Sequence, residues 1–546
     1  MKILNRIISP LLIAIISTII FSAYLPNYVF SIDSAKFVLY VRYMLDHGWS
    51  LIASINKNHF DYNLSLAVSL SYLSVKLFGE YSIVILSLPS AIASGITLSI
   101  VYLIGRLKSK EVAILSCLFL ISTGLFFYEA RTLSIIPYIS LCSILILFIS
   151  ITLVDISILW LICYILFAFI SGLFAGILGI IMACLPAICY LLCHQYYKRF
   201  IQSVIISLIL ALGIFVVIKL VATATLEAKI AQQVIQQQLL TLTSNFSLVD
   251  LQKYLLFSLI VSPIALLAII INIKQFSTND WLKSLTLWFV IAVIISILTE
   301  YKMFITAVAS MALLATILFE DYHKKEKFSI FISYIFVIIP FISLLITLSS
   351  YLGFPKQAHM RPTATGASLY FDSLILLSLC CILVSFLNLR RKVLFKESNH
   401  ILIIALAVAS LLIVNIGVIS PSMIEFNQTV QFSYQLQSML LKNNQPVLFY
   451  KINPYTQDTI LFANLSNMKN LHFIYIKNKK NLLYALQKNP QSYVISAKSK
   501  QVISDIAEID KKILKTNQQQ GDKQYKLKLA GKIENKELNL QQNMEK

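Results

Sequence analysis

An acid near the start of the chain stands where chemistry at a membrane surface is possible. Asp33 follows directly after the first long apolar run, which fixes the depth of its carboxylate at the edge of a bilayer. A carboxylate at that depth can order an acceptor, or take its proton, while a membrane-anchored donor presents a reactive carbon. The alternative is a solvated acid at the end of a helix, so the neighbouring residues have to decide between the two interpretations.

Cations and polar side chains follow this acid. Lys36 and Arg42 lie on an expected amphipathic helix that begins beside Asp33. The polar stretch 56–63 comes next, and the segment 64–79 is apolar but short and rich in serine. We expect an interfacial or re-entrant helix over 64–79, because it is too short to cross a bilayer with confidence.

The rest of the chain is a strongly apolar background. It has 546 residues, of which 58% are hydrophobic and 13% are charged, and its mean hydropathy is +0.78. A soluble globular protein is roughly a quarter charged, so the composition indicates a polytopic membrane protein. The net charge of +20 is also typical of a nucleic-acid binder. The basic residues, however, lie in short loops between apolar runs, as in membrane proteins, and we expect no nucleic-acid partner.

Windows long enough to span a bilayer number about thirteen. Two of them, 156–172 and 174–193, are expected to lie back to back. The others are 7–28, 81–105, 111–128, 133–153, 201–222, 252–273, 283–299, 303–319, 328–350, 368–389 and 401–419.

Charge in the loops predicts the orientation. Short, densely basic loops share a side with the N-terminus, so we expect that side to face the cytoplasm. The membrane is then expected to be a cell inner membrane. The first outer loop is then 29–80, and a Gln-rich amphipathic helix is expected within the outer loop 223–250. The outer loop 351–367 contains Arg361 among three basic side chains. They suggest an anionic ligand, although single outer cations are common.

The tail has a different pattern. Strands are expected at Val447–Ile452, Leu471–Ile476 and Tyr493–Ala497, with helical stretches between or after them. From residue 517 we expect a disordered end with one possible strand at Tyr525–Leu529. The expected fold class is therefore an all-α polytopic membrane domain over residues 1–420. A small α/β soluble domain on the periplasmic side covers residues 421–546.

Cysteine usage gives no sign of a cofactor. All eight cysteines lie in or beside apolar spans, and we expect buried apolar side chains. No metal site or other cofactor is predicted, and dependence on a divalent metal stays open.

A series of short motifs follows in order over roughly residues 5–320. They are Asp33-Ser34-Ala35-Lys36-Phe37, Arg42, Met44-Leu45, Gly48-Trp49, Leu77-Phe78-Gly79, Leu88-Pro89-Ser90-Ala91 and Lys302. Their order and spacing resemble the protein O-mannosyltransferase and lipid A aminoarabinose transferase superfamily of GT-C membrane glycosyltransferases. The number of spans and the outer tail domain resemble the aminoarabinose-transferase, or ArnT-like, branch.

This resemblance implies transfer of a sugar from a polyprenyl-phosphate donor. The catalytic acid of the family matches Asp33, and the candidates for binding the donor phosphate are Lys302, Arg131, Lys36 and Arg42. A cation beside the departing phosphate would stabilise the charge that develops as the glycosidic bond breaks. For Lys302 and Arg131 the alternative is ordinary snorkelling at a helix end.

Several polar positions of the family pattern are changed. The second acid of its Asp-Glu pair is Ser34 here, and the acid before a Pro in the third outer segment is Ile136. Either the donor differs, or other residues substitute, or catalysis is lost. The possible substitutes and substrate contacts are Asp61, Tyr62, Asn63, Glu129, Glu300 and Arg361.

The resemblance therefore implies an inverting hexosyl- or pentosyltransferase that uses undecaprenyl phosphate sugar. The acceptor would be lipid A, another envelope glycan or a protein hydroxyl, and membrane lipids surround the enzyme. Two alternatives stay open: a degenerate, non-catalytic protein that binds lipid-linked sugar, and a flippase or transporter. A flippase or transporter would need paired charged residues within the spans, and the spans contain almost no charged residues.

Overall fold

A computed structural model gives the fold of the chain. It describes most of the first 320 residues and short stretches beyond them. The described residues are 2–23, 25, 32–56, 59–64, 66–240, 261–276, 278–299, 301–320, 404–410, 412, 433, 447–450, 463–464, 473–476, 478–488, 493–497, 525–527 and 538–545. The predicted spans 328–350 and 368–389 lie outside the described residues.

The chain divides into two compact units. The first comprises residues 1–25, 47–80 and 84–419, and the second comprises residues 26–46, 81–83 and 420–546. The tail therefore shares a unit with the segment around Asp33. The predicted boundary after residue 420 stays a prediction.

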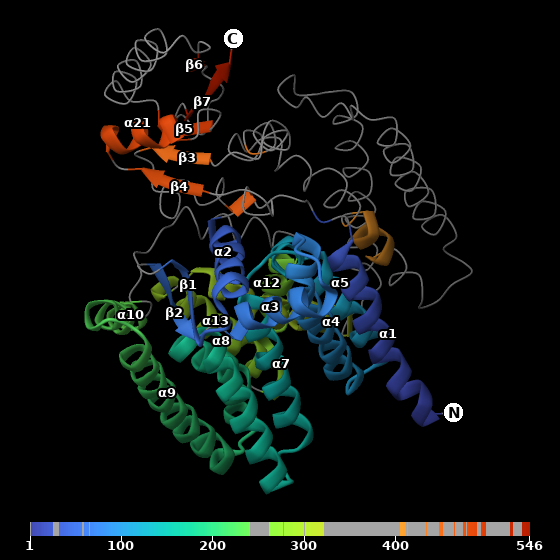
Figure 1. Cartoon of the computed structure of the whole chain (residues 1–546). Coiled ribbons are helices and arrows are strands. Elements are labelled where there is room, and N and C mark those ends of the chain that lie inside the picture. Colours follow the sequence, from blue (N-terminus) through green and yellow to red (C-terminus); the bar gives the residue numbers. More distant parts are fainter. Residues whose placement is uncertain are drawn as a thin grey trace, which may run out of the picture. The chain divides into compact units, whose positions relative to one another are not determined.

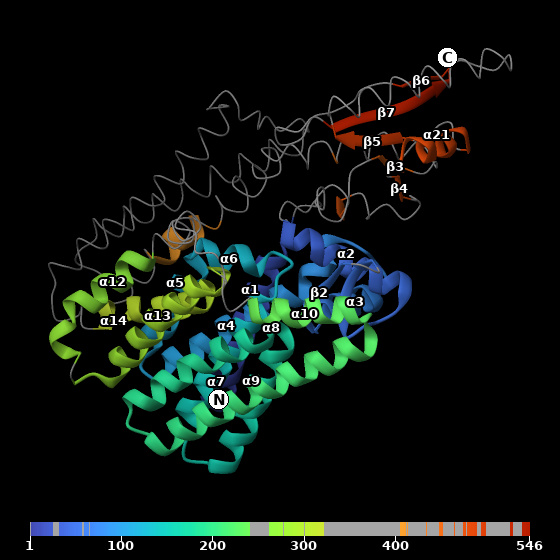
Figure 2. The ribbon, with the colours of Figure 1, turned by 90° about the vertical axis from the view of Figure 1, so that its left-hand side faces the viewer.

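Apolar helices dominate the first unit (Figure 1). They are α1 (Lys2–Ser22), α3 (Leu66–Phe78), α4 (Ile83–Arg106), α5 (Lys110–Ser122), α6 (Gly124–Ala130), α7 (Ile136–Thr152), α8 (Ser157–Cys193), α9 (Tyr197–Thr225), α10 (Ala228–Leu240), α12 (Val261–Ile271), α13 (Asp280–Leu298) and α14 (Ile305–Glu320), with the 3-10 turns η1 (Ile273–Gln275) and η2 (Tyr301–Phe304). The long α8 packs against α7, α9 and α13. The helices α12, α13 and α14 pack together (Figure 2).

Four described helices are long and apolar enough to cross a membrane, namely α4, α8, α9 and α13. A fifth span is formed if the bent pair α5 and α6 counts as one. The chain is therefore a membrane protein, and the number of about thirteen spans stays a prediction. The single span predicted over 111–128 is wrong in its shape. The chain bends there by 74° between α5 and α6, with Thr123 as the joint.

A break divides α8 where two separate windows were predicted. Ala175 and Gly176 leave helical geometry, and Gly176 has φ 61° and ψ −142°. Only glycine adopts that conformation without strain. Across the break the hydroxyl of Ser171 donates to the carbonyl of Gly179 at 2.8 Å, so the two halves of the helix approach each other closely.

A β-hairpin occupies the polar stretch of the first outer loop. The strands β1 (Ile52–Asn56) and β2 (His59–Leu64) pair antiparallel. The hairpin was not predicted, although β2 alternates regularly between polar and apolar residues from His59 to Leu64, as a strand does. β1 lacks this alternation, and the pairing of the two strands is irregular. Within the same unit β2 packs against α8 and α10. Helix α10 is the amphipathic helix expected in the loop 223–250; Ala231 and Val234 are its buried residues.

A five-stranded sheet forms in the tail. Its order is β4-β3-β5-β7-β6. β4, β3 and β5 are parallel, and β7 pairs antiparallel with β5 on one side and with β6 on the other. The strands are β3 (Val447–Tyr450), β4 (Phe473–Ile476), β5 (Tyr493–Ala497), β6 (Tyr525–Leu527) and β7 (Leu538–Glu545). Helix α21 (Lys479–Lys488) buries Leu482 and Leu486 against side chains of β3, β4 and β5. The expected disorder at the end of the chain is wrong for β7, whose backbone pairs with β5.

The cysteines follow the expectation only in part. Cys117, Cys142, Cys184 and Cys189 are buried, whereas Cys163 and Cys193 are half-buried.

Candidate functional site

Asp33 lies in the first turn of α2 (Ile32–His47), at the end of the helix where the dipole favours negative charge. The buried side of α2 includes Ala35, Val38 and Met44. Asp33 and Lys36 are both exposed, and a spacing of three residues makes them neighbours on the helix surface. The expected amphipathic helix is therefore present, and it brings the candidate acid and one candidate cation together.

Arg42, a second candidate cation on α2, has partners nearby. Its Nε donates to Oδ2 of Asp46 at 3.1 Å, and its guanidinium lies 5.8 Å from the ring centroid of Tyr81. The hydroxyl of Tyr81 in turn donates to the backbone carbonyl of Val38 at 3.0 Å. These contacts link α2 to the segment 81–83 of the same compact unit, which suits Arg42 to holding the helix in place.

A buried cation stands at the end of α6, in the first compact unit. The side chain of Arg131 is buried. Its Nη1 donates to the carbonyl of Ile20 at 3.2 Å, in the last turn of α1, where carbonyls lack helical partners. Its guanidinium also lies 5.1 Å from the ring centroid of Phe127. Arg131 therefore joins the end of α1 to the end of α6.

A buried acid accompanies this cation. Glu129 is buried near the C-terminal end of α6, the short helix that follows the 74° bend. Ionisable groups are expensive in a bilayer and usually mark a functional site. Broken helices at that depth are tolerated where protein or a water-filled cavity surrounds them. The end of α6, with Glu129 and Arg131, is therefore the part of the first unit best suited to polar chemistry.

The remaining predicted site residues are placed in part or not at all. Asp61, Tyr62 and Asn63 lie on β2 and Lys302 lies in η2, but their side chains are outside the described part of the chain. Glu300 and Arg361 lie outside it altogether. The structure thus forms two groups, Asp33 with Lys36 on α2 and Glu129 with Arg131 around α6, and these belong to different compact units.

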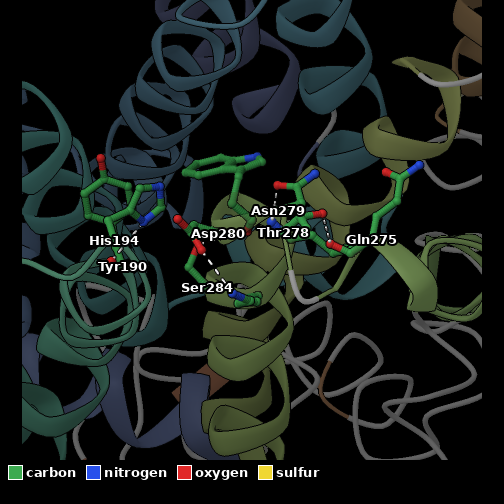
Figure 3. A network of polar contacts seen from close by, with 10 residues as sticks. Tyr190, His194, Gln275, Thr278, Asn279, Asp280 and Ser284 are labelled. Atoms are coloured by element: carbon green, nitrogen blue, oxygen red, sulfur yellow. Dashed lines mark hydrogen bonds and ion pairs between the residues drawn. The ribbon is translucent and has the colours of Figure 1, made fainter.

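A polar network that sequence reasoning missed lies where α8 ends and α13 begins (Figure 3). Nδ1 of His194 lies 3.0 Å from the carbonyl of Tyr190, and the two rings are 4.0 Å apart. Asn279 caps α13 by accepting from the backbone N–H of Leu282 at 3.1 Å. Asp280 pairs with Lys283, with Nζ and Oδ1 3.1 Å apart. The cap is a recognisable sequence signal, but the approach of α8 depends on tertiary packing.

The electrostatics of this network centre on His194. Burial lowers the pKa of its imidazole. Its hydrogen bond to the Tyr190 carbonyl and the Asp280 carboxylate act in the opposite direction, and Lys108 lowers the pKa further. Lys108 also lies 6.0 Å from the ring centroid of Trp281. The network thus connects three elements, α8, α13 and the α4–α5 loop, and its residues pair with one another, which suits a structural role.

Metal chemistry has no evident place among the residues that the structure describes. They contain no group of three or more His, Cys, Asp or Glu side chains that could hold a metal ion.

Comparison with known proteins finds similarity in the fold. No protein-family model and no curated protein sequence matches the chain. The crystal structure of ArnT from Cupriavidus metallidurans in the apo state aligns with a TM-score of 0.63 and 12% identity, over 99% of this chain and 98% of that one. The structure of the same protein bound to undecaprenyl phosphate aligns with a TM-score of 0.61 and 11% identity, over 90% and 93%.

A weaker likeness exists to the Archaeoglobus fulgidus oligosaccharyltransferase in the apo form. It has a TM-score of 0.47 and 12% identity, over 89% of this chain and 69% of that one. The likeness to the apo structure of ArnT extends along 99% of this chain. It confirms the GT-C resemblance read from the sequence at the level of the fold.

Proposed function

We propose that this protein is a membrane glycosyltransferase that moves a sugar from a polyprenyl-phosphate donor to an acceptor at the membrane surface. The observation that carries the proposal is the exposed carboxylate of Asp33, one helical turn from Lys36, in a chain with the fold of ArnT over almost its whole length. ArnT has been crystallised with undecaprenyl phosphate, a polyprenyl phosphate of the class that the proposed reaction releases from its donor.

The proposed reaction is a single displacement. The oxygen of the acceptor hydroxyl forms a bond to the anomeric carbon of the sugar, and Asp33 accepts the proton of that hydroxyl. The bond between that carbon and the phosphate oxygen breaks at the same time, and polyprenyl phosphate leaves with the bonding electron pair. Attack opposite the leaving group inverts the anomeric carbon. Lys36 is suited to the leaving phosphate, because an ammonium group beside it stabilises the developing charge.

The other candidate cations differ in how well they are suited to bind the donor phosphate. Arg131 and Lys302 stay proposed ligands of the donor phosphate. For Arg131 the support is its burial, two residues after the buried Glu129, at the C-terminal end of α6, since buried charge is retained where it functions. Arg42 is less suited, because the carboxylate of Asp46 already forms an ion pair with it. We assign to Glu129 the place of the acid that is missing at Ile136.

The finer features rest on the sequence and belong to the same proposal. They are about thirteen spans, residence in a cell inner membrane, and a periplasmic α/β domain over residues 421–546. The donor would carry undecaprenyl and one hexose or pentose. The acceptor would be lipid A, another envelope glycan or a protein.

A second candidate function is that of a protein that binds lipid-linked sugar without transferring it. One observation favours it: the position beside Asp33 that carries a second acid in the family is a buried serine, Ser34. A flippase or transporter has less support. Charged side chains in the four long apolar helices are few, and Glu129 and Arg131 lie outside them.

Mass spectrometry of envelope lipids, glycans and glycoproteins tests the proposal. It would compare the wild type, a deletion strain and a strain with Asp33→Ala. We expect one species to lose a sugar in both mutants. A species changed by the deletion but normal in Asp33→Ala would remove Asp33 from the mechanism. No change in any fraction would favour the non-catalytic alternative.

A further inference from the structure

Helix α3 is apolar but too short to cross a membrane. Its 13 residues, Leu66–Phe78, are about 20 Å long at 1.5 Å per residue, against about 30 Å of hydrocarbon in a bilayer. Four residues after it, Gly79 to Ser82, lead into α4, which is long and apolar enough to span. The end of α3 is thus held within a few residues of a membrane surface.

One side of α3 packs against the protein. Ala67, Val68, Ser71, Ser74 and Val75 are buried on it. The hydroxyl of Ser71 donates to the carbonyl of Leu86 in α4 at 2.7 Å. This contact fixes the rotation of the helix, and so it decides which side chains point away from the protein.

The opposite side exposes large apolar side chains. Leu73 and Leu77 are exposed there, and Leu77 is 73% accessible. Phe78 is exposed as well, but it is the last residue of the helix and its spacing puts it in line with Ser71 and Ser74. Trp49, from the segment after α2, is 57% accessible. Its indole Nε1 donates to the hydroxyl of Ser69 on α3 at 2.7 Å. We call Trp49, Leu73 and Leu77 the α3 apolar face.

Polar groups at this face suit a lipid headgroup layer. Lys76 is exposed on the last turn of α3, and its ammonium lies 5.7 Å from the ring centroid of Tyr72. Indole and phenol rings favour the boundary between headgroups and acyl chains, and a lysine there reaches toward lipid phosphates. A protein partner would not require this combination of leucines beside an aromatic and a cation. A bilayer surface interacts favourably with each of these groups: acyl chains with the leucines, the headgroup boundary with the aromatic rings, and lipid phosphates with the lysine.

We propose that the α3 apolar face binds the lipid surface, with its leucines among the upper acyl-chain carbons and Lys76 among the headgroups. The helix then lies in the membrane plane as an anchor between the hairpin β1–β2 and α4. This decides between the interfacial and re-entrant alternatives in favour of the interface. The inference does not depend on the proposed enzymatic activity.

Photo-crosslinking tests the contact with lipid. Benzoylphenylalanine would replace Leu77, Leu212 or Tyr484 in the full-length chain, which is then illuminated in nanodiscs of phosphatidylcholine and phosphatidylglycerol. These residues are 73%, 68% and 69% accessible, respectively. Leu212 lies on the span α9 and is the positive control, and Tyr484 lies on α21 in the tail and is the aqueous control.

We expect lipid adducts at position 77 within about two-fold of those at position 212, and at least about tenfold above those at position 484. Adducts at 212 without adducts at 77 would overturn the proposal. So would a crosslink from 77 to a second protein chain.

The depth of the face needs a second measurement. Trp49→Phe isolates the fluorescence of Trp49 by difference from the wild type. Its quenching is compared in lipids brominated near the headgroup and near the chain end. Stronger quenching by the shallow bromines is expected for an interfacial helix. Stronger quenching by the deep bromines would replace the interfacial helix with a re-entrant one.

Discussion

The acid at the start of α2 is the residue on which the proposed chemistry depends. Asp33→Asn keeps the size and exposure of the side chain but removes its ability to accept a proton. Loss of a general base lowers rates by about 10²–10⁴-fold, and we expect such a fall in sugar transfer by the purified protein. The thermal unfolding temperature should fall only slightly, because the side chain is exposed and its interaction with the helix dipole is worth less than about 1 kcal/mol.

The matched control for this substitution is Glu80→Gln, at an exposed acid between α3 and α4. It should leave transfer at the wild-type rate. Equal transfer by Asp33→Asn and the wild type would show that the acid at the start of α2 has no part in the chemistry.

Arg42 separates a positioning role from a binding role. If Arg42 and Tyr81 hold α2 in place, Tyr81→Phe should lower kcat several-fold and change KM for the donor little. The lost hydrogen bond to the Val38 carbonyl is worth about 1 kcal/mol. Arg42→Met should behave in the same way, because its ion pair with Asp46 is largely exposed and contributes less than about 1 kcal/mol.

The measurement is steady-state kinetics with varied lipid-linked donor, at two salt concentrations. A large rise in KM for Arg42→Met alone, which added salt reproduces in the wild type, would instead make Arg42 a phosphate ligand.

His194 predicts a dependence of stability on pH. Burial holds the pKa of its imidazole below the ordinary value of 6.5, so the unfolded chain binds a proton more readily than the folded protein. The contribution of His194 to the free energy of unfolding should therefore be fully present above pH 6.5. It should be lost as the pH decreases through the folded-state pKa. His194→Gln should make the unfolding temperature less dependent on pH between about 5 and 7. Parallel curves for variant and wild type would contradict the assignment.

At the scale of elements, the break in α8 depends on one glycine. Gly176→Ala would place a Cβ at φ 61° and ψ −142°, at a cost of about 1–3 kcal/mol. We expect a lower unfolding temperature in detergent, measured by tryptophan fluorescence. Gly213→Ala on α9 is the control, because nothing lies within 4 Å of its added Cβ. There alanine should be neutral or stabilise by up to about 1 kcal/mol. Equal effects of both changes would mean that α8 tolerates another geometry.

The elements that the sequence predicts well are those whose burial follows from composition alone. The window 81–105 corresponds to α4 (Ile83–Arg106), and 201–222 corresponds to α9 (Tyr197–Thr225), because long apolar runs have one stable state in a bilayer. The bend at Thr123 and the hairpin β1–β2 were missed. The bend at Thr123 depends on packing that no local pattern encodes. The hairpin had a local signal in the alternation of His59–Leu64, but β1 has none, and the pairing also depends on packing against α8 and α10.

The candidate site was predictable to a similar extent. The position of Asp33 at a helix start and the helical neighbours Asp33 and Lys36 follow from spacing. The contact between Arg131 and the end of α1 joins residues more than a hundred positions apart. The partners of Arg42 include Tyr81, which lies beyond the whole first outer loop. Because these partners of Arg131 and Arg42 lie far away in the sequence, they could not be predicted from it.

At the scale of the whole molecule, the two compact units predict how the tail affects the first outer loop. Residues 26–46, which include most of α2 and Asp33, share a unit with residues 420–546. Removal of the tail takes away most of that unit. If the unit is cooperative, a chain that ends at residue 420 should lose protection of the amides of α2 while α4, α8 and α9 keep theirs. Transfer activity should be lost with that protection.

Hydrogen exchange measured by mass spectrometry in nanodiscs tests this directly. The control is the full-length chain with Leu482→Ala and Leu486→Ala. These changes remove the α21 side chains that pack on the sheet but retain the rest of the tail, so their effect on α2 should be partial. If α2 exchanges equally in the truncated and full-length chains and transfer persists, the tail is an independent domain. The boundary after residue 420 would then also divide the function, and Asp33 would act with the membrane helices alone.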